Sequence, residues 1–232
     1  MYRNTFLSVM FLACCFNGSL CAQSDAQIYE RTCDAKTYPF SDPSPVATPN
    51  NSYYPYFRFD GFSMQAQEKQ WKMVVLENDY VKLTVTPEIG GKIWGAIDKV
   101  NNKEFVYTNG VVKFRDVAMR GPWTSGGIEF NFGIIGHAPT CSTPIDYLTK
   151  KNVDGSVSCH IFSYEWITRT VWNVEINLPK DKAYFTTHTT WFNQSSIDQP
   201  YYQWMNAGYA TKTGTRFYYP GTYSIGHSGD LH

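Results

Sequence analysis

Short stretches in which apolar and polar residues alternate constrain the fold of this chain more than any other feature. Val81, Leu83 and Val85 alternate with polar residues, and residues 160–178 form the longest alternating segment. Alternation with period two places apolar side chains on one face of a β-strand, and no helix-length window shows a convincing apolar period of 3.6 residues. Turn signals separate these stretches at spacings of about 10 residues, which is typical of sandwiches and barrels. We therefore predict an all-β protein built as an antiparallel β-sandwich.

The charge balance and the aromatic content narrow the class of partner. The chain has 20 Lys+Arg against 20 Asp+Glu, and it carries 17 Tyr, 15 Phe and 7 Trp in 232 residues. Proteins that bind nucleic acids or anionic membranes need a basic face, so we expect neither partner. Tyr and Trp in this number favour a surface that stacks on a ligand.

The first 22 residues have the organisation of a signal peptide. Arg3 precedes the mostly apolar stretch 6–16, and small residues follow up to Ala22. This apolar stretch is too short to span a bilayer, so we expect cleavage and export to the periplasm or the extracellular space, without a membrane span. We expect residues 23–70 to be an extended leader that contains Pro and Tyr, and residues 71–232 to be the folded domain.

Three cysteines, Cys33, Cys141 and Cys159, follow the predicted cleavage site. An odd number allows at most one intramolecular disulfide. Cys141 and Cys159 flank an expected hairpin connection and are the favoured pair, while two buried thiols are an equally good interpretation. The cysteine spacing fits no zinc motif, so we predict no metal site there. The sequence has no phosphate loop and no dinucleotide-binding fingerprint, and we predict no cofactor.

Residues that can transfer protons lie in and just after a glycine-rich block. Glu129 follows Gly126-Gly127 between apolar residues, and His137 comes shortly afterwards. A carboxylate in an aromatic setting and an imidazole are both suited to general acid–base catalysis, so we predict Glu129 and His137 as catalytic residues. The alternatives are a structural carboxylate paired with Arg120 and a loop histidine bonded to the backbone.

Six further residues are candidates for binding carbohydrate. A guanidinium and an amide can hold sugar hydroxyls, and an indole ring can stack on the C–H face of a pyranose. Two of the candidates share strand parity with a third, Trp204, and are expected on the same face. The candidates are Arg120, Trp123, Asn131, Tyr202, Trp204 and Asn206.

Three stretches resemble one known superfamily. Residues 76–93, which contain Pro-x-x-Gly-Gly at positions 87–91, resemble the opening of the aldose-epimerase, or galactose-mutarotase-like, superfamily. Residues 187–209 resemble a strand, a turn and the sugar-facing strand that follows them in that superfamily. The block Arg-Gly-Pro-Trp-Thr-Ser-Gly-Gly-Ile-Glu-Phe-Asn-Phe at residues 120–132 is similar to an uncharacterised exported bacterial branch, often followed by tetratricopeptide repeats. The resemblance covers residues 71–232.

The resemblance implies a galactose-mutarotase-like supersandwich whose concave sheet binds a sugar. It also implies a histidine on the sugar-facing strand, which the matching residues 201–206 lack, and a glutamate on a later strand, before which the sequence ends. We therefore expect the supersandwich to be incomplete in this chain and further domains to follow in a longer protein.

These observations predict an exported carbohydrate-active protein that binds a sugar or glycan in a cleft of the sandwich. Its chemistry would be epimerase-like or glycoside-cleaving proton transfer. The alternative is a non-catalytic carbohydrate-binding or structural β-module of a larger protein.

Overall fold

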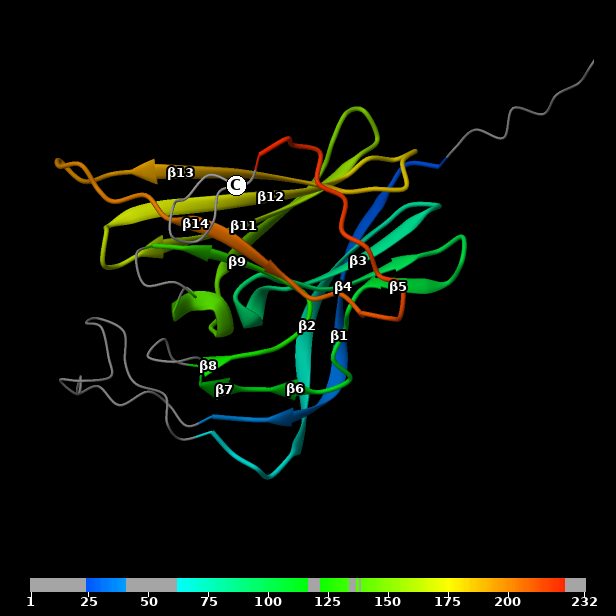
Figure 1. Cartoon of the computed structure of the whole chain (residues 1–232), viewed down its shortest axis with the longest axis horizontal. Coiled ribbons are helices and arrows are strands. Elements are labelled where there is room, and N and C mark those ends of the chain that lie inside the picture. The colour runs from blue at the N-terminus through cyan, green and yellow to red at the C-terminus, as the bar shows by residue number, and fades with distance from the viewer. Residues whose placement is uncertain (1–23, 41–61, 117–121, 134–136, 138, 224–232) are drawn as a thin grey trace, which may run out of the picture.

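A computed structural model describes residues 24–40, 62–116, 122–133, 137 and 139–223 of the chain. Strands dominate these residues, and the described part contains no α-helix. The described strands form two main β-sheets (Figure 1), and residues of both sheets contribute to one apolar core. The prediction of an all-β, sandwich-like fold is thus confirmed.

The larger sheet has eight strands, in the order β14-β9-β4-β3-β2-β1-β6, with β5 paired to β4. Its strands are β1 (Gln27–Tyr38), β2 (Gln67–Glu77), β3 (Val81–Thr86), β4 (Lys92–Asp98), β5 (Lys103–Val106), β6 (Val112–Lys113), β9 (Ile128–Phe132) and β14 (Gln203–Ala207). All its pairs are antiparallel except the short parallel contact of β1 with β6.

The smaller sheet has four antiparallel strands, in the order β10-β11-β12-β13. They are β10 (Asp146–Lys151), β11 (Val157–Glu165), β12 (Thr170–Leu178) and β13 (Thr186–Asn193). A separate pair consists of β7 (Arg115–Asp116) and β8 (Pro122–Trp123), and two 3-10 turns, η1 (Pro87–Ile89) and η2 (Pro139–Ser142), complete the described elements.

The core lies between the two sheets, where alternating apolar side chains meet. Val81, Leu83 and Val85 of β3 are at most 2% exposed and pack in one cluster with residues of β11 and β12. Phe132 of β9 stacks on Trp172 of β12, with ring centroids 4.5 Å apart. The alternation seen in the sequence thus produces the buried face of each sheet.

The larger sheet begins earlier in the chain than residue 71, where the folded domain was expected to start. β1 pairs antiparallel with β2 along a register that runs from Gln27↔Glu77 to Thr37↔Gln67. Most side chains of β1 are exposed or half-buried, so the strand lacks the apolar alternation that identifies β3. Part of the expected leader is therefore an integral strand.

A turn divides the long alternating segment 160–178 into β11 and β12. Arg169 has a left-handed backbone with φ 55°. The buried carboxylate of Glu165 accepts hydrogen bonds from the backbone N–H groups of Ile167 and Thr168, at 3.1 and 2.6 Å. These bonds satisfy backbone donors that the turn removes from the ladder.

Cys141 and Cys159 are both thiols in the structure, so the predicted disulfide between them is wrong. The hairpin β10–β11 does form, and Gly155 in its turn has φ 81°. However, the residue opposite Cys159 in β10 is Thr149, while Cys141 lies outside the hairpin in η2. Two buried thiols, the alternative interpretation, describe the structure.

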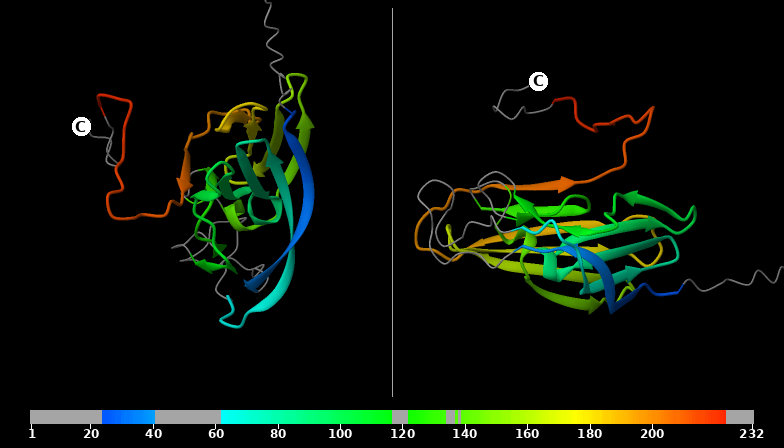
Figure 2. Two further views of the ribbon diagram at one scale, coloured as in Figure 1. Left: turned by 90° about the vertical axis from the view of Figure 1, so that its right-hand side faces the viewer. Right: turned by 90° about the horizontal axis from the view of Figure 1, so that it is seen from below.

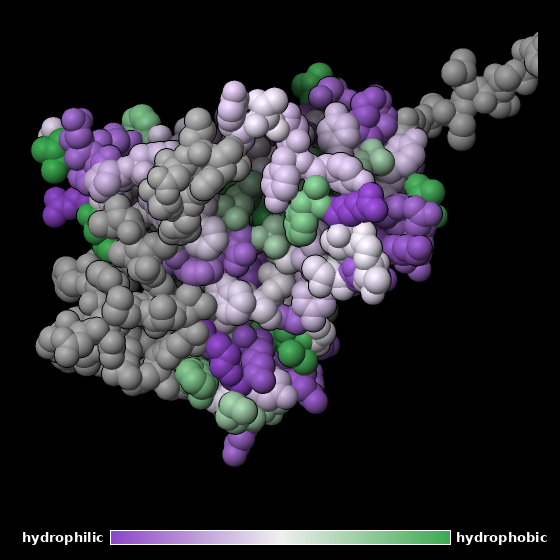
Figure 3. Space-filling model, in the orientation of Figure 1, coloured by the Kyte–Doolittle hydropathy of each residue, from purple (hydrophilic) through white to green (hydrophobic). Residues whose placement is uncertain are grey.

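The surface in Figure 3 is mainly hydrophilic where it is not grey, and hydrophobic residues occur there in separate small groups. Residues 209–223 run away from the two sheets (Figure 2) and carry exposed aromatic side chains such as Phe217 and Tyr218. Within the described residues, no helix has both the length and the apolar character needed to cross a membrane.

Candidate functional site

Strand β9 separates core residues from candidate functional residues by strict alternation. Ile128, Phe130 and Phe132 belong to the core between the sheets. Glu129 and Asn131 therefore face the other side of the larger sheet, yet they are only 2% and 0% exposed. A carboxylate and an amide are thus buried on the face of β9 that lies away from the sandwich core.

Strand β14 pairs with β9 and contributes to the same face. Asn206 lies directly opposite Glu129, and Trp204 directly opposite Asn131. Residues opposite one another in an antiparallel pair have their side chains on the same face. The pairing therefore brings Trp204 and Asn206 next to the two polar residues of β9.

Lys92 reaches this face from β4 because the chain beside it is glycine. Ile93 pairs with Ile128, so Lys92 lies next to the start of β9. Gly127 has φ 68°, and a Cβ at that position would stand 3.0 Å from two carbons of the Lys92 side chain and would clash with the carbonyl oxygen of Ile93. Only glycine combines this backbone conformation with the required close approach.

Glu129 is the centre of a buried polar cluster. Its Oε1 accepts a hydrogen bond from Asn131 Nδ2 at 2.8 Å and lies 2.6 Å from Nδ1 of His137. Its Oε2 lies 3.8 Å from Lys92 Nζ. We call Lys92, Thr124, Glu129, Asn131 and His137 the Glu129 cluster.

The contact between Glu129 and His137 engages Nδ1 of the imidazole. An ionised carboxylate only accepts hydrogen bonds, so the tautomer with its proton on Nδ1 is the one that donates to Oε1. Nε2 is then the nitrogen that can take up or release a proton at a ligand. The side chain of His137 is 22% exposed and that of Glu129 only 2%, so the imidazole is the accessible member of the pair.

The ammonium group of Lys92 is held away from solvent. It donates to the carbonyl oxygen and to Oγ1 of Thr124, the latter at 3.0 Å. Burial lowers the pKa of Lys92 below its ordinary value, and the negative charge of Glu129 opposes that decrease. Burial also raises the pKa of Cys141 to about 12, with the charge of Glu129 as the next cause, so this thiol is not a nucleophile at neutral pH.

Two tryptophan rings flank His137. The ring centroid of Trp204 lies 4.8 Å from that of His137 and the centroid of Trp123 lies 6.2 Å away, both in edge-to-face geometry. Both rings are half-buried, but their Nε1 atoms are buried without a hydrogen-bond partner, as is Glu129 Oε2. These are the three such side-chain atoms in the described part of the chain.

The structure brings together most of the residues that the sequence singled out. Glu129, Asn131, His137, Trp123, Trp204 and Asn206 lie at or beside the cluster. Tyr202 immediately precedes β14 and is 40% exposed. Arg120 lies outside the described residues.

Sequence reasoning missed Lys92 and Thr124. Lysine at the start of a strand normally faces solvent, and Thr124 looks like one more polar residue of a loop. The available signal is the pair Gly126-Gly127, because a Cβ at Gly127 would stand 3.0 Å from the side chain of Lys92.

No set of three or more His, Cys, Asp or Glu side chains in the described ranges is arranged to hold a metal ion. The Glu129 cluster itself offers one carboxylate beside an ammonium group, which is a poor environment for a cation.

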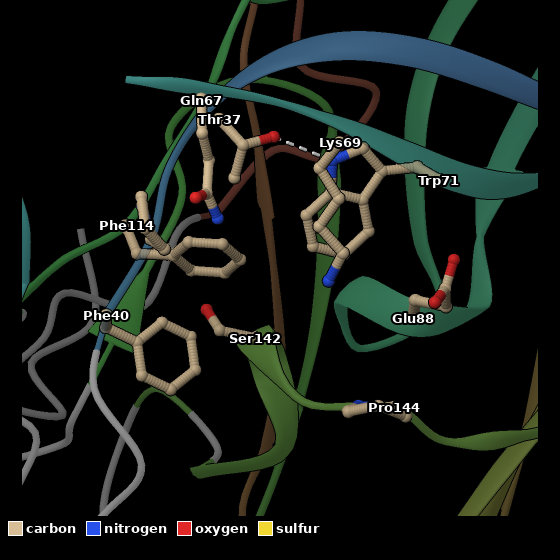
Figure 4. Close-up of a pocket in the computed structure, with 10 residues that line it drawn as sticks. Thr37, Phe40, Gln67, Lys69, Trp71, Glu88, Phe114, Ser142 and Pro144 are labelled. Atoms are coloured by element: carbon tan, nitrogen blue, oxygen red, sulfur yellow. Dashed lines mark hydrogen bonds between the residues drawn. The ribbon is translucent and has the colours of Figure 1, made fainter. Parts of the chain in front are cut away.

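A separate pocket of about 230 Å³ is lined in part by Ser142, the last residue of η2 (Figure 4). Trp71, Phe114 and Phe40 form its aromatic part, and Trp71 Nε1 donates to Thr37 Oγ1 at 2.9 Å. Lys69 Nζ covers the Trp71 ring at 3.8 Å from its centroid. The residues lining this pocket include none of the predicted site residues.

Two comparisons place the chain among known proteins. Residues 48–232 match the family described as a domain of unknown function, DUF5107. The crystal structure of a TPR-domain containing protein from Parabacteroides distasonis ATCC 8503 is similar to this chain, with a TM-score of 0.73 and 26% sequence identity. That similarity covers 80% of this chain but 32% of the other, so the chain spans about a third of that protein.

Proposed function

The chain belongs to the DUF5107 family of domains of unknown function, and from the geometry of its Glu129 cluster we propose that it binds a sugar or glycan there and transfers a proton to or from it. The observation that carries the proposal is the position of His137. Its imidazole is fixed at 2.6 Å by a buried carboxylate and lies between the rings of Trp123 and Trp204.

Sugar binding accounts for the combination of aromatic and polar groups. A half-buried indole ring offers an apolar face to the C–H groups of a pyranose, while neighbouring polar groups hold its hydroxyls. Trp204 and Asn206 are both half-buried on β14, beside Asn131 and Glu129. Stacking and hydrogen bonding are therefore available on one face of the sheet.

Proton transfer accounts for the pairing of Glu129 with His137. A carboxylate bonded to Nδ1 fixes the tautomer and the orientation of an imidazole, and Nε2 then acts as general base or general acid. Glu129 is the orienting group in this arrangement and His137 the group that exchanges protons with the sugar. Epimerase-like and glycoside-cleaving reactions both require such an exchange at a sugar oxygen.

The resemblance to mutarotases supports the same proposal. It implies a histidine on the sugar-facing strand, which corresponds to β14 in this chain and carries none. In this chain His137, from a different segment, lies beside β14, since its ring centroid is 4.8 Å from that of Trp204. We propose that the fold is a mutarotase-like sandwich with its imidazole supplied from the loop after β9.

A non-catalytic sugar-binding domain is the second candidate. The burial of Glu129 and its contacts with Lys92 and Asn131 favour this candidate, since such contacts also suit a purely structural carboxylate. In that case the tryptophan rings would bind the sugar and no proton would move.

The setting of the domain is also a proposal. The signal-peptide pattern of residues 1–22 supports export, and the similarity to part of a TPR-domain containing protein supports a place in a longer, multidomain chain.

The proposal is tested by isothermal titration of the whole chain with neutral monosaccharides and oligosaccharides, followed by an assay for turnover of any sugar that binds. We expect binding that Trp204→Ala weakens by about 2- to 10-fold, since an aromatic contact contributes about 0.5–1.5 kcal/mol beyond the area it buries. His137→Ala should retain binding and lose turnover. Absence of binding by the unmodified protein at millimolar sugar would contradict the proposed function, and binding without turnover would favour the second candidate.

A further inference from the structure

Glu129 and the two tryptophans beside the Glu129 cluster leave three buried hydrogen-bonding atoms without partners. They are the Nε1 donors of Trp123 and Trp204 and the Oε2 acceptor of Glu129. Buried polar atoms are nearly always paired, and each one left unpaired costs free energy. The side chains that carry them all neighbour His137, which indicates a place that a ligand completes.

The charges of the cluster limit what that ligand can be. The side chains of Glu129 and Lys92 are each 2% exposed, and their opposite charges lie 3.8 Å apart. Two of the three donors of the Lys92 ammonium group are directed to Thr124. The negative and the positive charge therefore offset each other within the protein, and a third buried charge would have no partner.

Each charged alternative meets a specific obstacle. An anionic group would accept from the indole N–H groups, but it would be repelled by Glu129 and would leave Oε2 without a donor. An ammonium group could donate to Oε2, but it would be repelled by Lys92 and could not accept from either indole. A hydroxyl group avoids both problems because it donates one hydrogen bond and accepts others.

We infer that the ligand presents uncharged hydroxyl groups to Trp123, Trp204 and Glu129, so that the site takes a neutral sugar and rejects uronic acids, amino sugars and sugar phosphates. This inference rests on the proposed function and narrows its substrate class. One hydroxyl donates to Glu129 Oε2, and sugar oxygens accept from the two indole N–H groups.

The test compares sugars that differ in charge and variants that differ in one N–H group. The probes are glucose and galactose, short neutral oligosaccharides of each, and the matching uronic acids, 2-amino sugars and 6-phosphates. The variants of the whole chain are Trp123→Phe and Trp204→Phe, which keep an aromatic ring and remove the donor. Trp71→Phe is the matched control, because the Trp71 donor is already bonded to Thr37.

We expect neutral sugars to bind at least about 100-fold more tightly than their charged counterparts, since misplaced charge costs several kcal/mol. Trp123→Phe and Trp204→Phe should each weaken binding by about 2- to 10-fold, the range for one hydrogen bond. Trp71→Phe should lower the melting temperature and leave the affinity unchanged. In ¹H–¹⁵N spectra, the indole resonances of Trp123 and Trp204 should shift on binding, while that of Trp71 stays.

The inference and the proposed function fail in different ways. If neither neutral nor charged sugars bind, the proposed function is wrong and the inference falls with it. If sugars bind but charged ones bind as tightly as neutral ones, or the two site variants bind like the unmodified protein, the inference alone is overturned. It is also overturned if both indole resonances show contact with trapped water that persists when sugar is bound.

Discussion

The carboxylate of Glu129 and the ammonium group of Lys92 face each other at 3.8 Å with both side chains almost completely buried. Neither group can be removed without leaving an opposite charge in the interior. Lys92→Met should therefore lower the free energy of unfolding by about 3–5 kcal/mol, as measured by urea denaturation. Lys92→Met combined with Glu129→Gln should recover part of that loss.

Lys99→Met is the control for the Lys92 and Glu129 variants. Lys99 pairs with Glu77 at 2.8 Å, but both side chains are partly exposed, so the loss should be no more than about 1 kcal/mol. Equal losses at Lys92 and Lys99 would show that burial of the Lys92–Glu129 pair has no energetic consequence.

His137 should carry the proton-transfer step, if the bound sugar is turned over. His137→Gln should lower kcat by about 10²-fold or more and change the binding constant little. His160→Gln is a matched control, because His160 also faces a glutamate, Glu175 at 3.7 Å, but lies in the smaller sheet. Comparable losses of kcat in both variants would argue against a specific role for His137.

The close approach of Gly127 to Lys92 and Ile93 should make it intolerant of a side chain. Gly127→Ala must accept a left-handed backbone and displace Lys92, so we expect a loss of about 2 kcal/mol or more in unfolding free energy. Gly110→Ala is the control, since nothing lies within 4 Å of a Cβ at that position. A similar melting temperature for both variants would contradict the close packing.

The buried thiols predict how stability changes in alkaline solution. Burial raises the pKa of Cys141 and of Cys159 from 9.0 to about 12. Between pH 9 and about 12, these thiols are deprotonated in the unfolded chain but keep their protons in the folded chain. The free energy of unfolding is therefore unaffected by them below pH 9 and decreases as the pH rises above 9. Within that window each thiol lowers the free energy of unfolding by about 1.4 kcal/mol per pH unit.

Urea denaturation of the reduced protein at several pH values between 8 and 10.5 measures this slope. Cys159→Ala should make the dependence on pH shallower than in the unmodified chain. Comparing the two proteins cancels the opposite trend from Lys92, whose lowered pKa makes stability rise with pH in the alkaline range. Identical slopes would show that the Cys159 thiol ionises normally in the fold.

The signal-peptide pattern predicts the start of the mature protein. Mass spectrometry of the exported chain should find an N-terminus at or near Gln23, because small residues precede that position. Recovery of the intact chain with Met1 from the cytoplasm would contradict export.

The sequence predicted those strands in which one face is buried and the other face is not. β3 alternates cleanly because one face meets the smaller sheet, and the hairpin expected between Cys141 and Cys159 forms as β10–β11, with Gly155 at positive φ in its turn. β1 was missed because it has few apolar residues in register, and its position depends on backbone pairing with β2. Backbone pairing between distant segments leaves little trace in a single sequence.

The candidate site was predicted in part for a similar reason. Glu129, Asn131 and His137 are close in the sequence, so local reasoning grouped them. Lys92 joins them through the pairing of β4 with β9, and the disulfide prediction failed because the register of β10 with β11 places Thr149, rather than Cys141, opposite Cys159. To predict which residues of separate strands become neighbours, one must know the order of the strands in the sheet. The alternation of apolar and polar residues does not reveal that order.

The pairing of β9 with β14 has a consequence for the order in which parts of the protein fold. The four strands of the smaller sheet lie between β9 and β14 in the sequence, and their connections are short. Local hairpins close faster than a contact that spans all of them, so β14 should dock late in folding. Until it does, the strand edge bearing Glu129 and Asn131 stays open to water and to proteases. The site should thus be the last part of the domain to become resistant to digestion.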